Sequence, residues 1–212
     1  MEERDTGVVL RTRPLTETSL IVHWLTERAG RIATVARGAR RPKSAFRGKL
    51  DLCQVARITF QRSRRGDLHT LREAVSVRSF PELRTSIEGL QSAAHAARLL
   101  ERVVETDAPV GSLYALFLQL VEEAASHPED PLPLLWFEWH LLADQGLAPS
   151  PEQAGLSPGG QAILLRLQAA ATNPPRIRLS TTQQQELRAC LNHWWEQSGV
   201  RPPRCGTEGS KH

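Results

Sequence analysis

The sequence lacks the features that would place the protein in a membrane or on a secretory route. Its 212 residues contain no run of about 18 apolar residues, so no segment is expected to span a bilayer. The first seven residues, MEERDTG, are acidic and polar, which is not the pattern of a signal peptide. We therefore expect a cytoplasmic protein.

Cysteine is scarce, and its spacing fits neither a zinc site nor a disulfide framework. Cys53, Cys190 and Cys205 lie far apart and form no CxxC pair. The seven histidines form no HExxH or HxH pattern, and none is paired with a cysteine at ligand spacing. We expect no metal ion and no other cofactor.

Catalytic motifs are also missing. The sequence has no GxSxG nucleophile elbow and no GxxxxGK[ST] phosphate loop. Its N-terminal part has no cluster of Asp and Glu that would suggest a two-metal nuclease. We therefore expect that the protein is not an enzyme.

Positive charge, in contrast, is concentrated in one stretch, RGARRPKSAFRGKL, at residues 37–50. It carries six basic residues and no acidic one, and residues 28–49 carry eight basic residues and again no acidic one. Residues 1–80 have a net charge of +9 and residues 81–212 a net charge of −5, within a total of +4. This asymmetry indicates a polyanionic partner for the first part and two domains with separate tasks.

The first 80 residues show the alternation of period two that is typical of strands. Turn-forming residues separate the strands, in ERAGR, in the basic stretch and in RSRRGD. Strands are expected at residues 7–13, 18–26, 31–37, 52–62 and 68–80. Five short strands without a helical period predict a five-stranded OB-fold β-barrel, and an SH3-like barrel is the main alternative.

From residue 81 the apolar residues recur with helical spacing. Helices are expected at residues 85–105, 111–126, 131–146, 157–172 and 180–199. Thr85 or Ser86 would cap the first helix and Thr181 or Thr182 the last, while Gly146 would end the third. The tryptophan-rich runs WFEWH and HWW are interpreted as core packing, with one tryptophan of HWW exposed or covered by a neighbouring element.

The predicted architecture is therefore an α+β multidomain protein. It has an OB-fold nucleic-acid-binding domain at residues 1–80, an α-helical domain at 81–199 and a disordered tail at 200–212. The acidic helical domain is expected to hold the protein contacts.

The basic stretch is the candidate binding site, because OB-fold loops and their open face bind single-stranded nucleic acid. Glycines at both of its ends would let the backbone approach phosphates, and Phe46 could stack on a base. Trp24 could also stack, but core packing is the favoured interpretation for it. Arg11, Arg13, Arg62, Arg64 and Arg65 would add further positive charge.

Several segments of the sequence resemble a known protein family. The segment VVLRTRPLTETSLIVHWLTERAGRIATVARGARRPKSAFRGKL at residues 8–50 is similar to the N-terminal domain of the bacterial RecO family of recombination mediators. The similarity rests on the RPLTETS entry, the TExxGR hairpin and the ARGARR…S…GKL loop. Further on, LHTLREAVSVRSFPELR and FEWHLLADQGLAP are similar to the family's closing strand and third helix.

The resemblance implies binding of single- and double-stranded DNA, annealing of complementary strands and help in loading recombinase in RecF-pathway DNA repair. It implies RecR and the single-stranded-DNA-binding protein as partners, and a nucleoid-associated location. Many family members carry a four-cysteine zinc site after the third helix, but this chain has SPEQAGLSPGGQAILL there without cysteine. The predicted DNA-binding residues are Arg37, Arg40, Arg41, Lys43, Arg47 and Lys49, with Arg11 and Arg13 added from the neighbouring strand.

A rival hypothesis from another class stays open. The chain could be a non-catalytic protein-interaction scaffold whose basic loop binds RNA or an acidic protein surface. Salt-dependent binding to bare oligonucleotides, without any partner protein, would favour the DNA-binding hypothesis.

Overall fold

The computed structural model describes residues 2–201 and residue 203, which form two compact units. Of the described residues, the first unit contains residues 2–81 together with Val104–Tyr114, and the second contains Glu82–Val103 and residues 115–201 and 203. The sequence assigned Val104–Tyr114 to the helical part. In the structure this segment instead bonds to the barrel, where the Asp107 amide donates to the Arg31 carbonyl at 2.9 Å. A loop segment of this kind has no periodicity from which its partner could be predicted.

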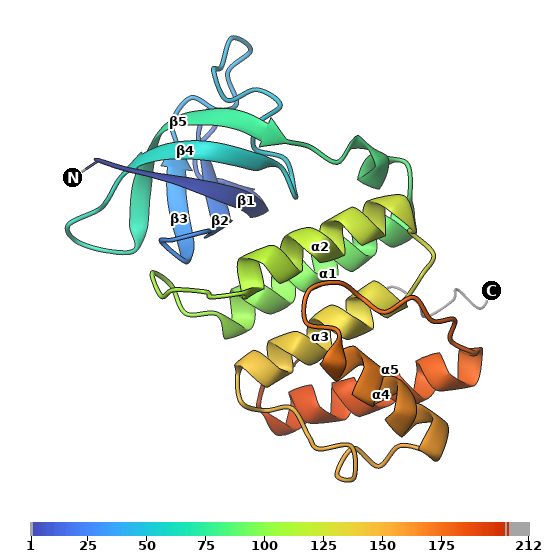
Figure 1. Ribbon diagram of the computed structural model, residues 1–212. Helices are drawn as coiled ribbons and strands as arrows, with labels where there is room; N and C mark the ends of the chain where they lie inside the picture. The colour runs from blue at the N-terminus through green and yellow to red at the C-terminus, as the bar shows by residue number, and fades with distance from the viewer. Residues whose placement is uncertain (1, 202, 204–212) are drawn as a thin grey trace. The chain divides into compact units, whose positions relative to one another are not determined.

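Five strands close the barrel of the first unit: β1 (Glu2–Pro14), β2 (Leu20–Thr26), β3 (Arg31–Ala36), β4 (Val55–Gln61) and β5 (Leu68–Arg78) (Figure 1). Their order around the barrel is β1-β2-β3-β5-β4, with β3 and β5 parallel and the other pairs antiparallel. This is the OB-fold arrangement, so the OB-fold prediction is confirmed and the SH3-like alternative is excluded.

Strand β1 is longer than predicted, because it starts at Glu2 rather than at residue 7. Its first half, from Glu2 to Val8, pairs with β4, and its second half, from Gly7 to Pro14, pairs with β2. The early residues are polar and carry no strand pattern of their own. Pairing with β4, which lies far away in the sequence, makes them a strand.

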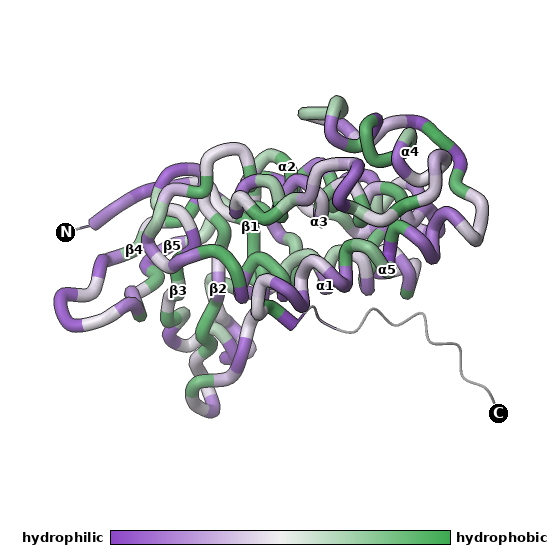
Figure 2. Tube along the Cα trace, turned by 90° about the horizontal axis from the view of Figure 1, so that it is seen from below, coloured by the Kyte–Doolittle hydropathy of each residue, from purple (hydrophilic) through white to green (hydrophobic). Residues whose placement is uncertain are grey.

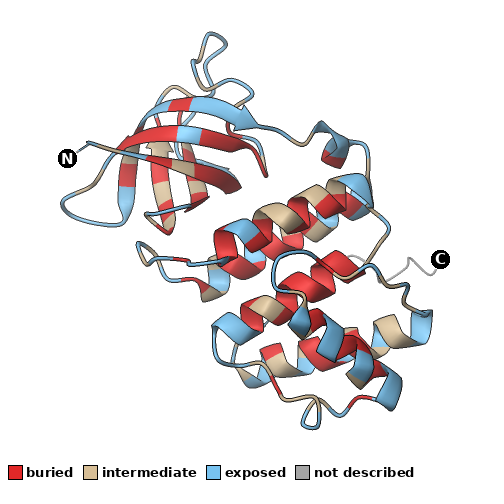
Figure 3. Cartoon of the chain, viewed as in Figure 1, coloured by how far each residue is buried: buried red, intermediate tan, exposed pale blue. Residues whose placement is uncertain are grey.

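The barrel interior is filled by the inward residues of each strand. Val9, Val22, Ile32, Ile58 and Phe60 are among the residues at 0–1% exposure in this core. Figure 3 shows buried residues along the barrel strands, and in β3 they alternate with half-buried ones.

Trp24 belongs to the same core. It is fully buried, and its indole Nε1 donates a hydrogen bond of 2.9 Å to the hydroxyl of Thr34. Trp24 is therefore a core residue, as favoured from the sequence, and it offers no face to a nucleic-acid base.

The second unit is helical, and its core lies around α3. The helices are α1 (Ile87–Val103), α2 (Leu113–Ser126), α3 (Leu132–Asp144), α4 (Pro158–Ala169) and α5 (Thr181–Gln197), and a short 3₁₀ helix spans Pro81–Arg84. Helix α3 contacts α1, α4 and α5, so nearly all of its residues are buried. A helix that is apolar on all sides is stable only in such a central position.

Two of the helix ends predicted from the sequence are observed in the structure, and one is not. The Ser86 hydroxyl caps α1 by accepting from the Gly89 amide at 3.2 Å, and Gly146, with φ of 69°, ends α3. The predicted caps Thr181 and Thr182 of α5 are wrong. Ser180 is the N-cap, in a reciprocal capping box with Gln183, which leaves both threonines inside the first turn.

The first part of α3, where the resemblance to the family's third helix begins, lies in the core of the helical unit. Trp136 and Phe137 are fully buried, and the Trp136 indole donates a hydrogen bond of 2.6 Å to the Ala170 carbonyl. Glu138 is fully buried and paired with Arg188 of α5. The interpretation of these aromatic residues as core is confirmed, and so is that of Trp195, while Trp194 is half-buried.

No helix within residues 2–201 is long and apolar enough to cross a bilayer. The disordered tail predicted for residues 200–212 lies mostly outside the described residues, which include only 200, 201 and 203 of it.

Candidate nucleic-acid interface

The basic loop, residues 37–50, connects β3 to β4 and folds as a series of tight turns. Amides of residues 41, 44, 47 and 49 donate to carbonyls three residues earlier, at 3.0–3.3 Å. Gly38 and Gly48 both have φ of 69°, a left-handed conformation that other residues rarely adopt. Successive turns reverse the chain within a short length, so one compact loop carries the basic residues.

Apolar residues of the basic loop fix it to the barrel. Leu50 is 6% exposed and belongs to the barrel core, and Ala39 and Phe46 pack against that core. The sequence offered Phe46 as a stacking face for a base, but its ring is half-buried against the barrel. Phe46 therefore serves as an anchor for the loop.

Arg40 joins the basic loop to the β1–β2 loop. Its amide donates to the Thr18 carbonyl at 3.0 Å, and its guanidinium donates to the Thr16 carbonyl at 3.3 Å. Two loops that are separate in the sequence are thus held side by side. The β1–β2 loop is one of the loops through which OB-folds bind oligonucleotides.

The structure leaves the charges of the six basic residues of this loop without acidic partners. Their side chains are exposed, apart from that of Lys49, which is half-buried. Within the described part of the chain, none of the six forms an ion pair with an Asp or Glu. The six residues are Arg37, Arg40, Arg41, Lys43, Arg47 and Lys49. A group of unneutralised cations on a fixed loop is a surface that attracts phosphates.

Arg11 and Arg13 lie on β1 rather than in the loop. Both are exposed, and in the β1–β2 ladder Arg11 is opposite His23 and Arg13 opposite Ile21. Burial, and then the nearby arginines beginning with Arg11, lower the pKa of His23 to about 4. His23 is therefore neutral at physiological pH, and the roles of Arg11 and Arg13 in binding stay predictions.

The turn between β4 and β5, residues 62–67, contains the other arginines singled out in the sequence. Arg62 is held by Glu3 at 2.8 Å and by Asp107 at 2.5 Å, and these carboxylates raise its pKa. The charge of Arg62 is therefore neutralised by ion pairs within the barrel unit, whereas Arg64 and Arg65 are exposed. Figure 2 shows this turn as a largely hydrophilic loop.

Buried His69 also supports this turn, a role that the sequence did not predict. Its Nδ1 accepts from the Ser63 amide at 3.3 Å, so its Nε2 carries the proton that faces Asp107, also at 3.3 Å. Asp107 thus binds both Arg62 and His69. Sequence reasoning could not find this link, since Asp107 lies 38 residues beyond His69.

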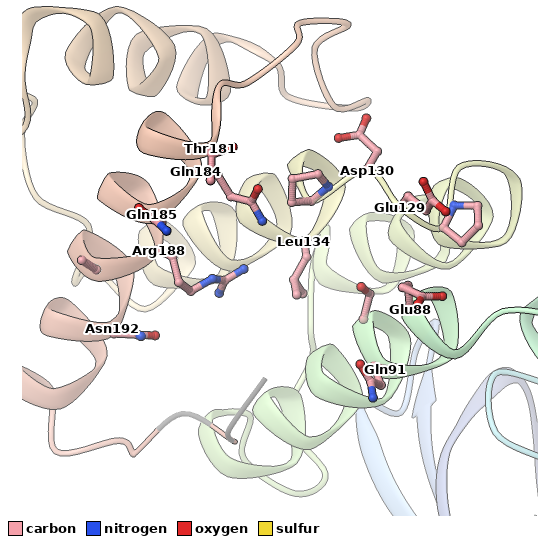
Figure 4. Close-up of a pocket in the computed structure, with 14 residues that line it drawn as sticks. Glu88, Gln91, Glu129, Asp130, Leu134, Thr181, Gln184, Gln185, Arg188 and Asn192 are labelled. Carbon is pink, nitrogen blue, oxygen red and sulfur yellow. The ribbon is translucent and has the colours of Figure 1, made fainter. Parts of the chain in front are cut away.

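The helical unit contains a separate cavity of about 520 Å³, lined by residues of α1, α3, α5 and the connection between α2 and α3 (Figure 4). Glu88, Glu129 and Asp130 contribute negative charge, and the one basic residue of the lining, Arg188, is paired with Glu138. The cavity is therefore acidic and unsuited to a polyanion.

The described residues contain no group of three or more His, Cys, Asp or Glu that could hold a metal ion. Cys53 and Cys190 are buried free thiols, and burial raises the pKa of Cys53 to about 12. At neutral pH Cys53 is thus protonated and unreactive.

Comparisons with known proteins agree with this geometry. Residues 1–80 match the family model described as "Recombination protein O N terminal", and residues 84–153 match "Recombination protein O C terminal". A protein of Rhodopirellula baltica named "DNA repair protein RecO" is 34% identical over 147 residues, which cover 69% of this chain and 54% of that protein.

A protein of the same name from Xanthomonas oryzae pv. oryzae is 37% identical over 153 residues, covering 69% of this chain and 60% of its own length. The chain thus spans somewhat more than half the length of these relatives. Two adjoining family models that together match most of the chain, and relatives above 30% identity, show that the chain belongs to the RecO family.

Proposed function

We propose that the barrel unit binds DNA through the basic loop and that the chain acts as a strand-annealing mediator in recombinational DNA repair. The carrying observation is the set of six cations without acidic partners, presented on a loop that Ala39, Phe46 and Leu50 anchor to the barrel. Because the loop is already ordered, little conformational entropy is lost when a phosphate backbone binds it.

Annealing by this surface needs no catalytic group. Two complementary strands repel each other as polyanions, and a cationic loop neutralises their phosphates so that they can approach. The same loop has no side chains arranged as a groove-reading helix, and its phenylalanine is packed against the barrel. Bases therefore stay free to pair while the backbone is held.

The partners are proposals as well, since the chain spans only 54% to 60% of the relatives' length. RecR and the single-stranded-DNA-binding protein are the proposed protein partners, and the helical unit is the proposed place of contact. Its net negative charge makes it a poor surface for DNA. The proposed location is the cytoplasm, in association with the nucleoid.

The test measures how binding to bare oligonucleotides depends on salt. Each lost phosphate contact lowers the log–log salt slope by about 0.7 on single strands, so replacing three contacting residues lowers it by about 2. We expect this loss for the variant Arg40→Ala, Arg41→Ala and Lys43→Ala, together with slower annealing of complementary strands. Affinity should fall equally for unrelated sequences.

A matched control removes three exposed arginines of the helical unit, by Arg98→Ala, Arg166→Ala and Arg178→Ala. It changes the net charge by the same amount and should keep the wild-type slope. Circular dichroism checks that both variants fold. An unchanged slope in the folded loop variant refutes the role of the loop, and absence of salt-dependent binding by the wild type favours the protein-interaction scaffold instead.

A further inference from the structure

A second basic site lies where β3 and β5 separate. The parallel ladder between these strands consists of three pairs and ends at Val35 opposite Thr70. Arg37 and Arg72 each follow two residues after that last pair, so they flank the point at which the strands diverge. The β4–β5 register shifts at Arg72, so alternation along β5 breaks there, but Leu71 is buried, Arg72 is exposed, and Arg72 lines the same cavity as Thr70.

The place where the strands diverge is a cavity of about 580 Å³ on the outside of the barrel. Its lining comes from the start of the basic loop, the end of β4, the β4–β5 turn and the first part of β5. The lining residues are Arg37, Gln61, Arg62, Ser63, Arg64, Leu68, Thr70 and Arg72. Four of these eight residues are arginines and none is acidic, so the cavity is suited to an anion and not to an apolar ligand.

The four arginines have different roles. Arg62 is neutralised by Glu3 and Asp107 and supports the wall of the cavity. Arg37, Arg64 and Arg72 have no acidic partner among the residues the structure describes. Arg72 donates a hydrogen bond to the Gln61 side chain, which orients its guanidinium without cancelling its charge.

We propose that this cavity is a phosphate subsite for the DNA backbone, distinct from the outer part of the basic loop. Arg37, Arg64 and Arg72 would donate to the phosphodiester oxygens, because the guanidinium fork matches phosphate geometry. Arg37 belongs both to the basic loop and to this cavity, so one strand held by the loop continues into the cavity. The inference rests on the proposed DNA binding and adds a second contact region to it.

The variant Arg64→Gln with Arg72→Gln tests the subsite. Two lost phosphate contacts lower the salt slope on single strands by about 1.4. The control variant, Arg57→Gln with Arg98→Gln, removes the same charge from exposed positions, one on β4 and one on α1, which do not line the cavity. The control should keep the wild-type slope.

A footprint locates the contact directly. Phenylglyoxal modifies accessible arginines, and mass spectrometry reports the modified positions in the wild-type chain. A bound single-stranded oligonucleotide should protect Arg64 and Arg72 several-fold, while Arg57 stays reactive. Inorganic phosphate at the same phosphate concentration should protect them much less, because only the polymer is held at several points.

The outcomes separate the two hypotheses. If the loop variant loses slope but the cavity variant behaves like its control, and Arg64 and Arg72 stay reactive, the subsite is refuted and DNA binding by the loop stands. If the wild type binds no DNA, both are refuted. Equal protection by inorganic phosphate and by the oligonucleotide would show a site for a free anion, which also overturns the assignment.

Discussion

Glu138 and Arg188 provide the sharpest test of how the helical unit is stabilised. Glu138 is fully buried on α3, where it is paired with Arg188 of α5 and lies 3.1 Å from His95 Nε2. Burial by itself would raise the pKa of Glu138, but Arg188 and His95 outweigh it and hold the pKa at about 2. We predict that Arg188→Met destabilises this unit strongly, because it leaves a buried carboxylate without its main partner.

Removing one partner of a buried ion pair costs about 3–5 kcal/mol. The Arg188 side chain is 23% exposed, so water can reach the vacated place and the loss should be near the lower end, about 3 kcal/mol. For a unit of this size that corresponds to a fall in melting temperature of roughly 10 °C. The double variant with Glu138→Gln removes both charges, and its loss should be no more than about 1 kcal/mol.

The pH dependence gives an independent readout. The folded pKa of Glu138 is about 2, below its ordinary value of 4.5, so its stabilisation is present above pH 4.5 and is lost as the pH falls toward 2. In Arg188→Met, burial raises that pKa instead, and the cost of the substitution should shrink as Glu138 becomes protonated.

Thermal melting at several pH values, followed by circular dichroism, measures both effects. A single variant that loses less than about 1 kcal/mol, or a double variant that is no more stable than the single one, would refute the ion-pair argument.

The remaining predictions concern acid, the Asp107 link and zinc. The folded pKa of His23 is lowered from 6.5 to about 4, so neutral His23 favours the folded state above pH 6.5, and this contribution is lost as the pH falls toward 4. His23→Gln should therefore flatten the dependence of the free energy of unfolding on pH between 4 and 6.5. An unchanged pH profile would contradict this prediction. Asp107→Asn should cost about 1 kcal/mol in a melt of the barrel, since its pair with Arg62 is partly exposed, whereas the control Asp67→Asn in the exposed turn should cost nothing measurable. Metal analysis of the purified, untagged chain should give well below one zinc per chain, because the connection between α3 and α4 has no cysteine, and a chelator-resistant zinc would contradict this.

Much of the fold could be predicted because strong local patterns produced it. Alternation in LIVHWLT predicted a strand with two buried faces, and Ile21, Val22, Trp24 and Leu25 are all buried. Helical spacing gave the existence and approximate bounds of all five helices of the described chain. The ends were less certain, since Ser180 and not a neighbouring threonine caps α5 and polar residues 2–6 join β1.

Some features of the candidate site could likewise be predicted from the sequence, and others could not. The sequence determined the number and spacing of the cations in residues 37–50, because charge and glycine content can be read locally. It could not show that Phe46 turns inward as an anchor, or that Arg62 is neutralised, because both depend on residues distant in the chain. Arg72 did not stand out at all, as one arginine in a strand has no distinctive pattern.

The sequence by itself therefore determined that a basic loop follows the third strand of a small barrel and that a helical part comes after it. Only the tertiary structure decided which arginines have no acidic partner and can bind a ligand. Arg62 is neutralised by Glu3, which precedes it in the sequence, and by Asp107, which follows it, and only folding places these carboxylates beside it. The tertiary structure also decided that Arg37, Arg64 and Arg72 share one cavity. Ion pairs and cavities depend on distances in space, and strand pairing sets those distances independently of separation in the sequence.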